Sequence, residues 1–287
     1  MKVTILEPSG YCAGVDHAME TAIKTKEENP SKNVVVLGML VHNEDSLKEL
    51  EKHGIKTIYR QNCSYEQLID HILEPSIVIL TAHGHTKAVE DKLLKRGHKI
   101  VDATCPFVKQ SFVNILNAIK NGKEVFYIGV KDHPEAVAAL SLSEKVHFID
   151  IKNPRIPNIE QKSLTVISQT TLSRFEVQGL CDKIKQVYKD AEFLDGICNA
   201  STKRQEALMN LNEDIDMVYI VGGLNSNNSK TLFNLAKELY PNKQVKLIQN
   251  SNDINKKDLN GLSHIAISSG ASTPRGIINQ IKSKLLD

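Results

Sequence analysis

Three of the five cysteines recur at a fixed interval along the 287-residue chain. Cys12, Cys105 and Cys198 follow one another at intervals of 93 residues, with no compact C-x-x-C pair. Thiolates that converge from distant segments suit a soft metal. Such a centre could be zinc with a histidine as fourth ligand, or an iron–sulfur cube held by three irons, whose open iron is a Lewis acid. Pro106, next in "DATCP", favours iron–sulfur slightly.

Polar side chains also recur at equivalent positions of the repeat. Three of them follow the cysteines by 28 to 30 residues: His42, His133 and Ser226. Another set follows further apolar runs: His83, Thr170 and Ser272. Neutral donors just before helical segments suit a phosphate group. The loops "LNSNNS" and "SSGAST" are typical of an anion cradle, although each alone also fits an ordinary helix cap and turn.

One carboxylate, Glu135, follows His133 by two residues in "DHPEA". Close to a metal-bound hydroxyl it could deliver protons. A glutamate in the first turn of a helix also favours the helix dipole, and the sequence fits both interpretations. Cys63, Cys181 and His85 have no counterparts in the other repeats. We expect the two cysteines to be ordinary thiols and His85 to lie at the surface.

The segments that must position these residues repeat with the cysteines. After each cysteine come a helical pattern, an apolar β-type run and a polar loop. The runs are "NVVVLG", "EVFYIG" and "MVYIVGG". A second run in each unit, "SIVIL", "LTVIS" or "HIAIS", ends in the further polar residues, and "VTIL", "KIVDA" and "AEFLD" precede the cysteines. Strands that alternate with helices predict parallel sheets.

The repeat predicts an α/β protein of three similar small domains. We expect them at residues 13–104, 105–197 and 198–287. The N-terminal strand within 1–12 would complete the third domain, because that unit ends on a helix. Ligands bind beyond the carboxyl ends of strands in open parallel sheets, where all three cysteines and the six polar loops lie. A pseudo-threefold axis would direct them to one central site.

Composition excludes several classes of protein. The chain is 41% hydrophobic and 24% charged, and 36 basic residues nearly balance 34 acidic ones, for a net charge of +2. This balance offers no argument for a nucleic-acid or membrane-surface partner. The first residues lack a signal-peptide core, and no apolar run reaches the roughly 18 residues of a spanning helix. We expect a cytoplasmic protein without a disulfide framework.

Nine motifs in order carry a resemblance to a known family along the whole chain. They are "GYCAGVDHA", "VHN", "AHG", "DATCP", "HPE", "SQTTLS", "ICNASTKRQEA", "NSNNS" and "SGASTP". The sequence resembles the 4-hydroxy-3-methylbut-2-enyl diphosphate reductase family, which catalyses the last step of the non-mevalonate isoprenoid pathway. The resemblance implies three α/β domains around one central 4Fe–4S cluster per chain, held by Cys12, Cys105 and Cys198.

The resemblance also implies a reaction and residue roles. Reductive removal of the substrate hydroxyl would give isopentenyl and dimethylallyl diphosphate, with electrons from a ferredoxin or flavodoxin. Our hypothesis places that hydroxyl on the open iron. Glu135, Thr170 and His133 would serve catalysis, with Thr170 relaying the proton. The diphosphate would be bound by His42, His83, His133, Ser226, Asn228 and Ser272. Asn227, where many relatives have a serine, can also donate to phosphate.

Two other classes fit parts of the pattern. A hydrolase could hold zinc on the same three cysteines and a histidine. A non-enzymatic iron–sulfur sensor or carrier could use the cysteines without any need for phosphate donors. Metal analysis separates the first class, and diphosphate binding separates the second.

Overall fold

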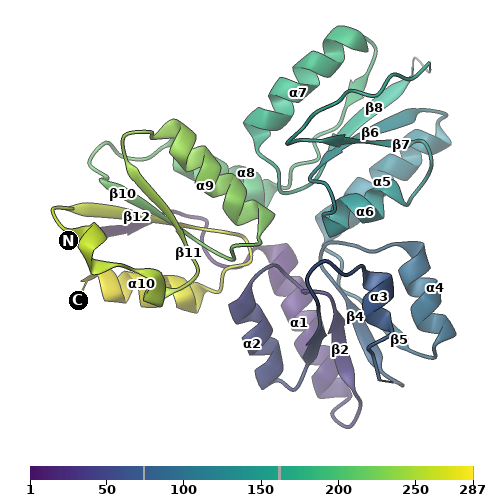
Figure 1. The fold of residues 1–287 in the computed structure, drawn as a ribbon, viewed down its shortest axis with the longest axis horizontal. Coiled ribbons are helices and arrows are strands. Elements are labelled where there is room, and N and C mark those ends of the chain that lie inside the picture. The colour runs from purple at the N-terminus through teal and green to yellow at the C-terminus, as the bar shows by residue number, and fades with distance from the viewer. Residues whose placement is uncertain (74, 161–162, 287) are drawn as a thin grey trace. The chain divides into compact units, whose positions relative to one another are not determined.

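The computed structural model describes residues 1–73, 75–160 and 163–286, which form three sheets of four parallel strands (Figure 1). The strand orders are β1-β12-β10-β11, β3-β2-β4-β5 and β7-β6-β8-β9. The strands are β1 (Lys2–Ile5), β2 (Val34–Leu37), β3 (Lys56–Ile58), β4 (Ile77–Leu80), β5 (Lys99–Asp102), β6 (Glu124–Gly129), β7 (Val146–Asp150), β8 (Leu164–Ser168), β9 (Glu192–Phe193), β10 (Met217–Val221), β11 (Gln244–Ile248) and β12 (His264–Ser269). The expectation of three α/β domains with parallel sheets is confirmed.

Helices connect most of the consecutive strands, which is usual for parallel pairing. They are α1 (Ala13–Glu28), α2 (Glu44–Lys52), α3 (Tyr65–Ile69), α4 (Lys87–Lys95), α5 (Pro106–Lys120), α6 (Pro134–Leu140), α7 (Arg174–Val187), α8 (Asn199–Met209), α9 (Asn227–Leu239) and α10 (Arg275–Leu286), with 3₁₀ turns at Ser251–Asp253 and Lys256–Leu259. Among the described helices, none combines the length and apolar character needed to cross a bilayer.

Central strands are buried on both faces, which explains their unbroken apolar sequences. In β10, Met217 and Tyr219 pack with α10, whereas Val218 and Ile220 pack with side chains of α8 and α9. Successive strand residues point to opposite faces, so one run serves two cores. The same division occurs in β6, where Tyr127 packs against α5 and α6, while Phe126 packs against α7.

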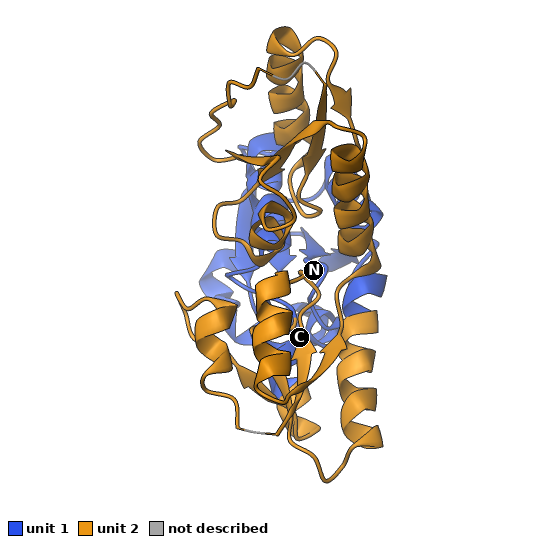
Figure 2. Cartoon of the chain, turned by 90° about the vertical axis from the view of Figure 1, so that its right-hand side faces the viewer, with its two compact units in different colours: residues 1–16, 41–49, 198–287 blue, residues 17–40, 50–197 orange. Residues whose placement is uncertain are grey.

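The N-terminal strand pairs with the C-terminal part of the chain. β1 lies parallel to β12, with Lys2 opposite His264 and Ile5 opposite Ile267. The chain divides into two compact units, residues 1–16, 41–49 and 198–287, and residues 17–40 and 50–197 (Figure 2). The first unit contains the sheet of β1, β10, β11 and β12, and the second contains the other two sheets.

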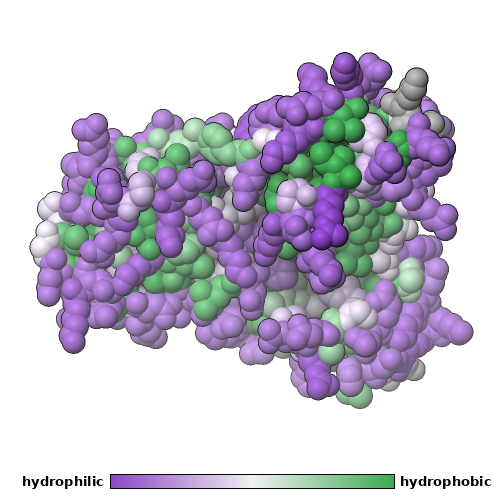
Figure 3. Space-filling view, turned by 45° about the horizontal axis from the view of Figure 1, so that its top comes forward, coloured by the Kyte–Doolittle hydropathy of each residue, from purple (hydrophilic) through white to green (hydrophobic). Residues whose placement is uncertain are grey.

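Hydrophilic side chains cover most of the face seen in Figure 3, with apolar side chains gathered in smaller areas between them. Exposed apolar residues include Phe107, Val113 and Leu116 of α5. Single exposed apolar side chains are normal on folded proteins, so they indicate no particular partner.

Candidate active site

Each of the three evenly spaced cysteines lies immediately before a helix. Cys105 and Cys198 are the N-cap residues of α5 and α8, and Cys12 directly precedes α1. Neither N-cap cysteine makes a side-chain capping bond. All five cysteines, which lie within the described residues, are thiols rather than disulfides.

In the first unit, hydrogen bonds tie the loops around Cys12 and Cys198 to the end of β12. The Cys12 amide donates to the Ala271 carbonyl at 2.9 Å. Asn228 accepts from the Ala271 amide at 2.8 Å, and its Nδ2 donates to Ser201 Oγ at 3.1 Å. Ser201 Oγ is itself 3.2 Å from Cys198 Sγ. Asn228 therefore joins the "SGAST" loop to the turn that carries Cys198.

The predicted phosphate-binding loops of this unit approach one another closely. Ser226 caps α9, its Oγ accepting from the Ser229 amide at 3.3 Å. A Cβ on Gly223 would lie 2.3 Å from the His42 carbonyl oxygen, so only glycine fits there. Burial, with the positive charge of Lys230, lowers the pKa of His42 to about 4. His42 is therefore neutral at neutral pH and can donate one ring N–H.

In the second unit, two predicted histidines are in contact. The rings of His83 and His133 meet edge to face with centroids 5.5 Å apart. His133 is the N-cap of α6, and its Nδ1 accepts from the Glu135 amide at 3.2 Å. Because Nδ1 is the acceptor, the proton of the neutral ring is on Nε2. Cys105 lies on the neighbouring turn, where its amide donates to the Ala82 carbonyl at 3.0 Å.

Glu135 is a buried carboxyl held by three donors. The amide and hydroxyl of Thr170 each donate to it at 2.8 Å, to Oε1 and Oε2 respectively. The hydroxyl of Tyr127 donates to Oε1 at 3.2 Å. Only 1% of Glu135 is exposed. Burial raises its pKa to about 7, against the lowering effect of the three hydrogen bonds. Such a carboxyl exchanges protons readily at neutral pH.

Each unit thus gathers part of the predicted set. The first unit holds Cys12, His42, Cys198, Ser226, Asn227, Asn228 and Ser272, and the second holds His83, Cys105, His133, Glu135 and Thr170. Glu135 lies in the first turn of α6, and its pKa is raised by burial.

Three residues have no counterparts in the other repeats: Cys63, Cys181 and His85. Cys63 and Cys181 pack against hydrophobic clusters, and burial raises the pKa of Cys181 to about 11. The surface position expected for His85 is wrong. Its side chain is only 10% exposed, and its Nε2 lies 2.8 Å from Glu90 Oε1. The Glu90 carboxylate, five residues further along the chain, offers the imidazole a hydrogen-bond partner and so lowers the cost of burying it.

Sequence reasoning missed two residues that shape the site. Tyr127 is hidden within the apolar run "EVFYIG", where an aromatic residue only indicates a strand. Arg204 lies in the helical segment that follows Cys198, and its spacing offered a signal. Ser201, Arg204 and Leu208 recur at helical intervals, and all three are buried. A charged residue on the apolar face of a helix implies a function.

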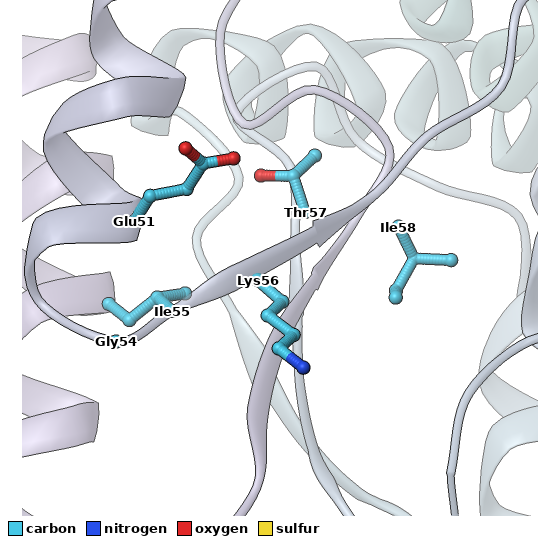
Figure 4. A pocket seen from close by; sticks show the side chains of 6 residues that line it. All are labelled: Glu51, Gly54, Ile55, Lys56, Thr57 and Ile58. Carbon is cyan, nitrogen blue, oxygen red and sulfur yellow. The ribbon is translucent and has the colours of Figure 1, made fainter.

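A surface pocket next to β3 includes none of the predicted residues (Figure 4). Its lining comprises Glu51, Gly54, Ile55, Lys56, Thr57 and Ile58. The charged side chains there, Glu51 and Lys56, are exposed and of opposite sign. The pocket therefore lacks the converging donors of the candidate site.

Parallel α/β sheets, cysteines at the starts of three helices and a buried acid with a raised pKa are typical of an enzyme. The chain belongs to the LytB protein family, whose model matches residues 3–286. This confirms the family resemblance of the motifs.

Curated relatives match the chain over nearly its full length. The 4-hydroxy-3-methylbut-2-enyl diphosphate reductase of Malacoplasma penetrans is 36% identical, covering 98% of this chain and 96% of the relative. The enzyme of the same name from Symbiobacterium thermophilum is 34% identical, covering 98% and 95%. These relatives are oxidoreductases by name.

Solved structures agree with the sequence relatives. The E-1-hydroxy-2-methyl-but-2-enyl-4-diphosphate reductase of Plasmodium falciparum superposes with a TM-score of 0.88 at 26% identity, covering 100% of this chain and 88% of that chain. A structure described as (E)-4-hydroxy-3-methyl-but-2-enyl diphosphate reductase, the terminal enzyme of the non-mevalonate pathway, gives a TM-score of 0.67 at 28% identity, covering 100% and 99%.

Proposed function

We propose that this chain reduces (E)-4-hydroxy-3-methylbut-2-enyl diphosphate to isopentenyl and dimethylallyl diphosphate. In this reaction two electrons and two protons enter, the allylic C–O bond breaks and water leaves. The full-length match to reductases of this name supports the proposal. The observation that carries it is the buried Glu135 carboxyl with a pKa of about 7, in the helical turn that begins at His133.

The cysteines fit a 4Fe–4S cluster as the cofactor. Sulfur donors are the usual ligands of such clusters. An N-cap residue without a capping bond forgoes about 1 kcal/mol of helix stability, so Cys105 and Cys198 suit another task. On this proposal Cys12, Cys105 and Cys198 hold one cluster per chain. When bound, the cluster would supply the electrons for the reduction and a Lewis-acidic iron.

The diphosphate is bound mainly by neutral donors. His42 and His133 each present one ring N–H, because both rings are neutral in the arrangement described above. The loop before α9 adds the positive end of the helix dipole, and the nearby Lys230 adds a full charge. The proposed set of substrate ligands is His42, His83, His133, Thr170, Ser226, Asn227, Asn228 and Ser272.

Glu135 and Thr170 form the proton path to the substrate hydroxyl. At neutral pH a large fraction of Glu135 carries a proton. Thr170 Oγ1 lies 2.8 Å from Glu135 Oε2 and can pass a proton on while receiving another. Protonation of the departing oxygen turns it into water, a far better leaving group than hydroxide. His133 holds the first turn of the helix that carries Glu135.

Four further parts of the proposal rest on the sequence. The domain limits follow the repeat, at 13–104, 105–197 and 198–287 with 1–12. A pseudo-threefold arrangement would bring the cysteines of the three domains to one cluster. The electron donor is a ferredoxin or a flavodoxin, and the reaction takes place in the cytoplasm.

One experiment tests the proposal against its alternatives. The protein is purified without oxygen, its iron and acid-labile sulfide are counted, and turnover of the hydroxymethylbutenyl diphosphate is measured with a reduced viologen dye. We expect a brown protein with iron and sulfide that consumes the substrate. A colourless zinc protein would indicate the hydrolase class. A cluster without turnover or diphosphate binding would indicate a sensor or carrier.

A further inference from the structure

Arg204 is a buried cation inside the first unit. Only 2% of its surface is exposed. Its three hydrogen bonds all go to main-chain carbonyl oxygens: Nε to Ser269 at 3.1 Å, Nη1 to Ala200 at 3.1 Å and Nη2 to Gly10 at 2.7 Å. Each of the three guanidinium nitrogens therefore donates one hydrogen bond, and no carboxylate within the described residues accepts a hydrogen bond from this cation.

The segments bonded to Arg204 carry two of the proposed cluster ligands. Gly10 lies two residues before Cys12, and Ala200 lies two residues after Cys198. Ser269 ends β12, just before the loop whose Ala271 carbonyl accepts from the Cys12 amide. One side chain therefore fixes both cysteine-bearing segments to the same strand end.

Burial and the neighbouring cysteines act on the charge of Arg204 in opposite directions. Burial lowers the pKa of its guanidinium, whereas Cys12, Cys198 and then Glu7 raise it. A buried charge is costly unless an opposite charge compensates it. Arginine cannot lose its proton in a protein, so the charge is permanent. A negatively charged cluster on Cys12 and Cys198, whose segments are bonded to Arg204, would compensate it.

We propose that Arg204 is a positioning residue that fixes the Cys12 and Cys198 segments and raises the reduction potential of the cluster they hold. The inference rests on the proposed function for the presence of that cluster. Reduction adds one negative charge to the cluster, and a buried cation nearby favours the more negative state. Loss of the cation therefore makes the cluster harder to reduce.

The test compares the variants Arg204→Gln and Arg204→Lys with the wild type and with Lys203→Gln. Lys203 is the exposed neighbour on α8, so its variant removes one positive charge from the surface of the same helix. Anaerobic titration with dithionite, followed by visible and electron paramagnetic resonance spectra, gives the one-electron potential. Iron content and thermal unfolding are measured on the same samples.

We expect Arg204→Gln to lower the reduced-to-oxidised ratio at a fixed potential at least about tenfold, which is 59 mV for one electron. Arg204→Lys should keep a potential near that of the wild type but unfold at lower temperature, because it keeps the charge and loses hydrogen bonds. Lys203→Gln should change neither. A wild-type potential in a fully loaded Arg204→Gln protein would overturn the inference.

If Arg204→Gln does not fold, the variant Arg204→His tests the electrostatic role of this residue instead. Its imidazole changes charge with pH, so the potential of this variant should fall more steeply between about pH 5.5 and 8.5 than that of the wild type. Equal slopes would refute the electrostatic role. A wild-type protein that holds no iron would instead count against the proposed function, which keeps the two failures distinct.

Discussion

Substitution of Tyr127 by phenylalanine should move the pH dependence of turnover towards higher pH. The Tyr127 hydroxyl donates to Glu135 Oε1 and so stabilises the carboxylate form. Phenylalanine fills nearly the same volume between α5 and α6 but cannot donate. The carboxyl keeps its two bonds from Thr170, so Glu135 stays in place while its pKa rises above the wild-type value of about 7.

The size of the shift follows from the length of the lost bond. A hydrogen bond to a charged group contributes about 1.5 to 3 kcal/mol. At 3.2 Å the Tyr127 bond is longer than the usual 2.7 to 2.8 Å for O–H···O, which favours the lower value. About 1.5 kcal/mol corresponds to roughly one pH unit. Because the protonated acid is the active form in the proposed reaction, turnover should persist about one pH unit higher.

The assay is a pH–rate profile of kcat with a viologen dye as electron source. Tyr219→Phe is the matched control. Tyr219 is equally buried on β10, and its hydroxyl has no hydrogen-bond partner within the described residues. The control should therefore keep the wild-type profile. A Tyr127→Phe profile that stays in place or moves to lower pH would refute the role assigned to this hydroxyl and to Glu135 as the acid.

Three further predictions address the acid, the cluster and the fold. Glu135→Gln should keep the visible absorbance of the cluster but lower kcat by 10² to 10⁴-fold, the usual contribution of a general acid. Because the folded pKa of Glu135 is raised from 4.5 to about 7, wild-type stability should fall by about 3 kcal/mol as pH rises through that range, and denaturant titrations should show a flatter dependence for the variant. Cys105→Ser should lose the cluster absorbance and iron; a fully loaded variant would exclude Cys105 as a ligand. Gly223→Ala should cost about 1 to 3 kcal/mol of stability in urea titrations, because its Cβ would meet the His42 carbonyl oxygen at 2.3 Å. Gly179→Ala, in open space on α7, should be neutral or slightly stabilising, and equal losses in both would contradict the steric argument.

The central strands and the helices after the cysteines were predictable because their patterns are local. Apolar runs such as "NVVVLG" and "MVYIVGG" form β2 and β10, which are buried on both faces. The outer strands β3, β7 and β11 gave no such signal. Each lies at the edge of its sheet and is partly exposed, so its sequence mixes polar and apolar residues.

The repeat also predicted which side chains follow the strands, because a polar residue that follows an apolar run can be recognised in the sequence itself. The supporting contacts were not predictable. Tyr127 meets Glu135 because β6 runs beneath the first turn of α6, and Arg204 meets Gly10 across 194 positions of sequence. Both contacts depend on side-chain packing that no periodicity encodes.

The pairing of β1 with β12 sets an order for biosynthesis. Thr4 and His264, which are hydrogen-bonded in the folded protein, lie 260 positions apart in sequence. A growing chain leaves the ribosome from its N-terminus. The sheets built from β2 to β9 can therefore close while β1 still has no partner strand. The segment that carries Cys12 follows β1 directly and is synthesised long before β12, so insertion of the proposed cluster would have to wait until β12 has been made.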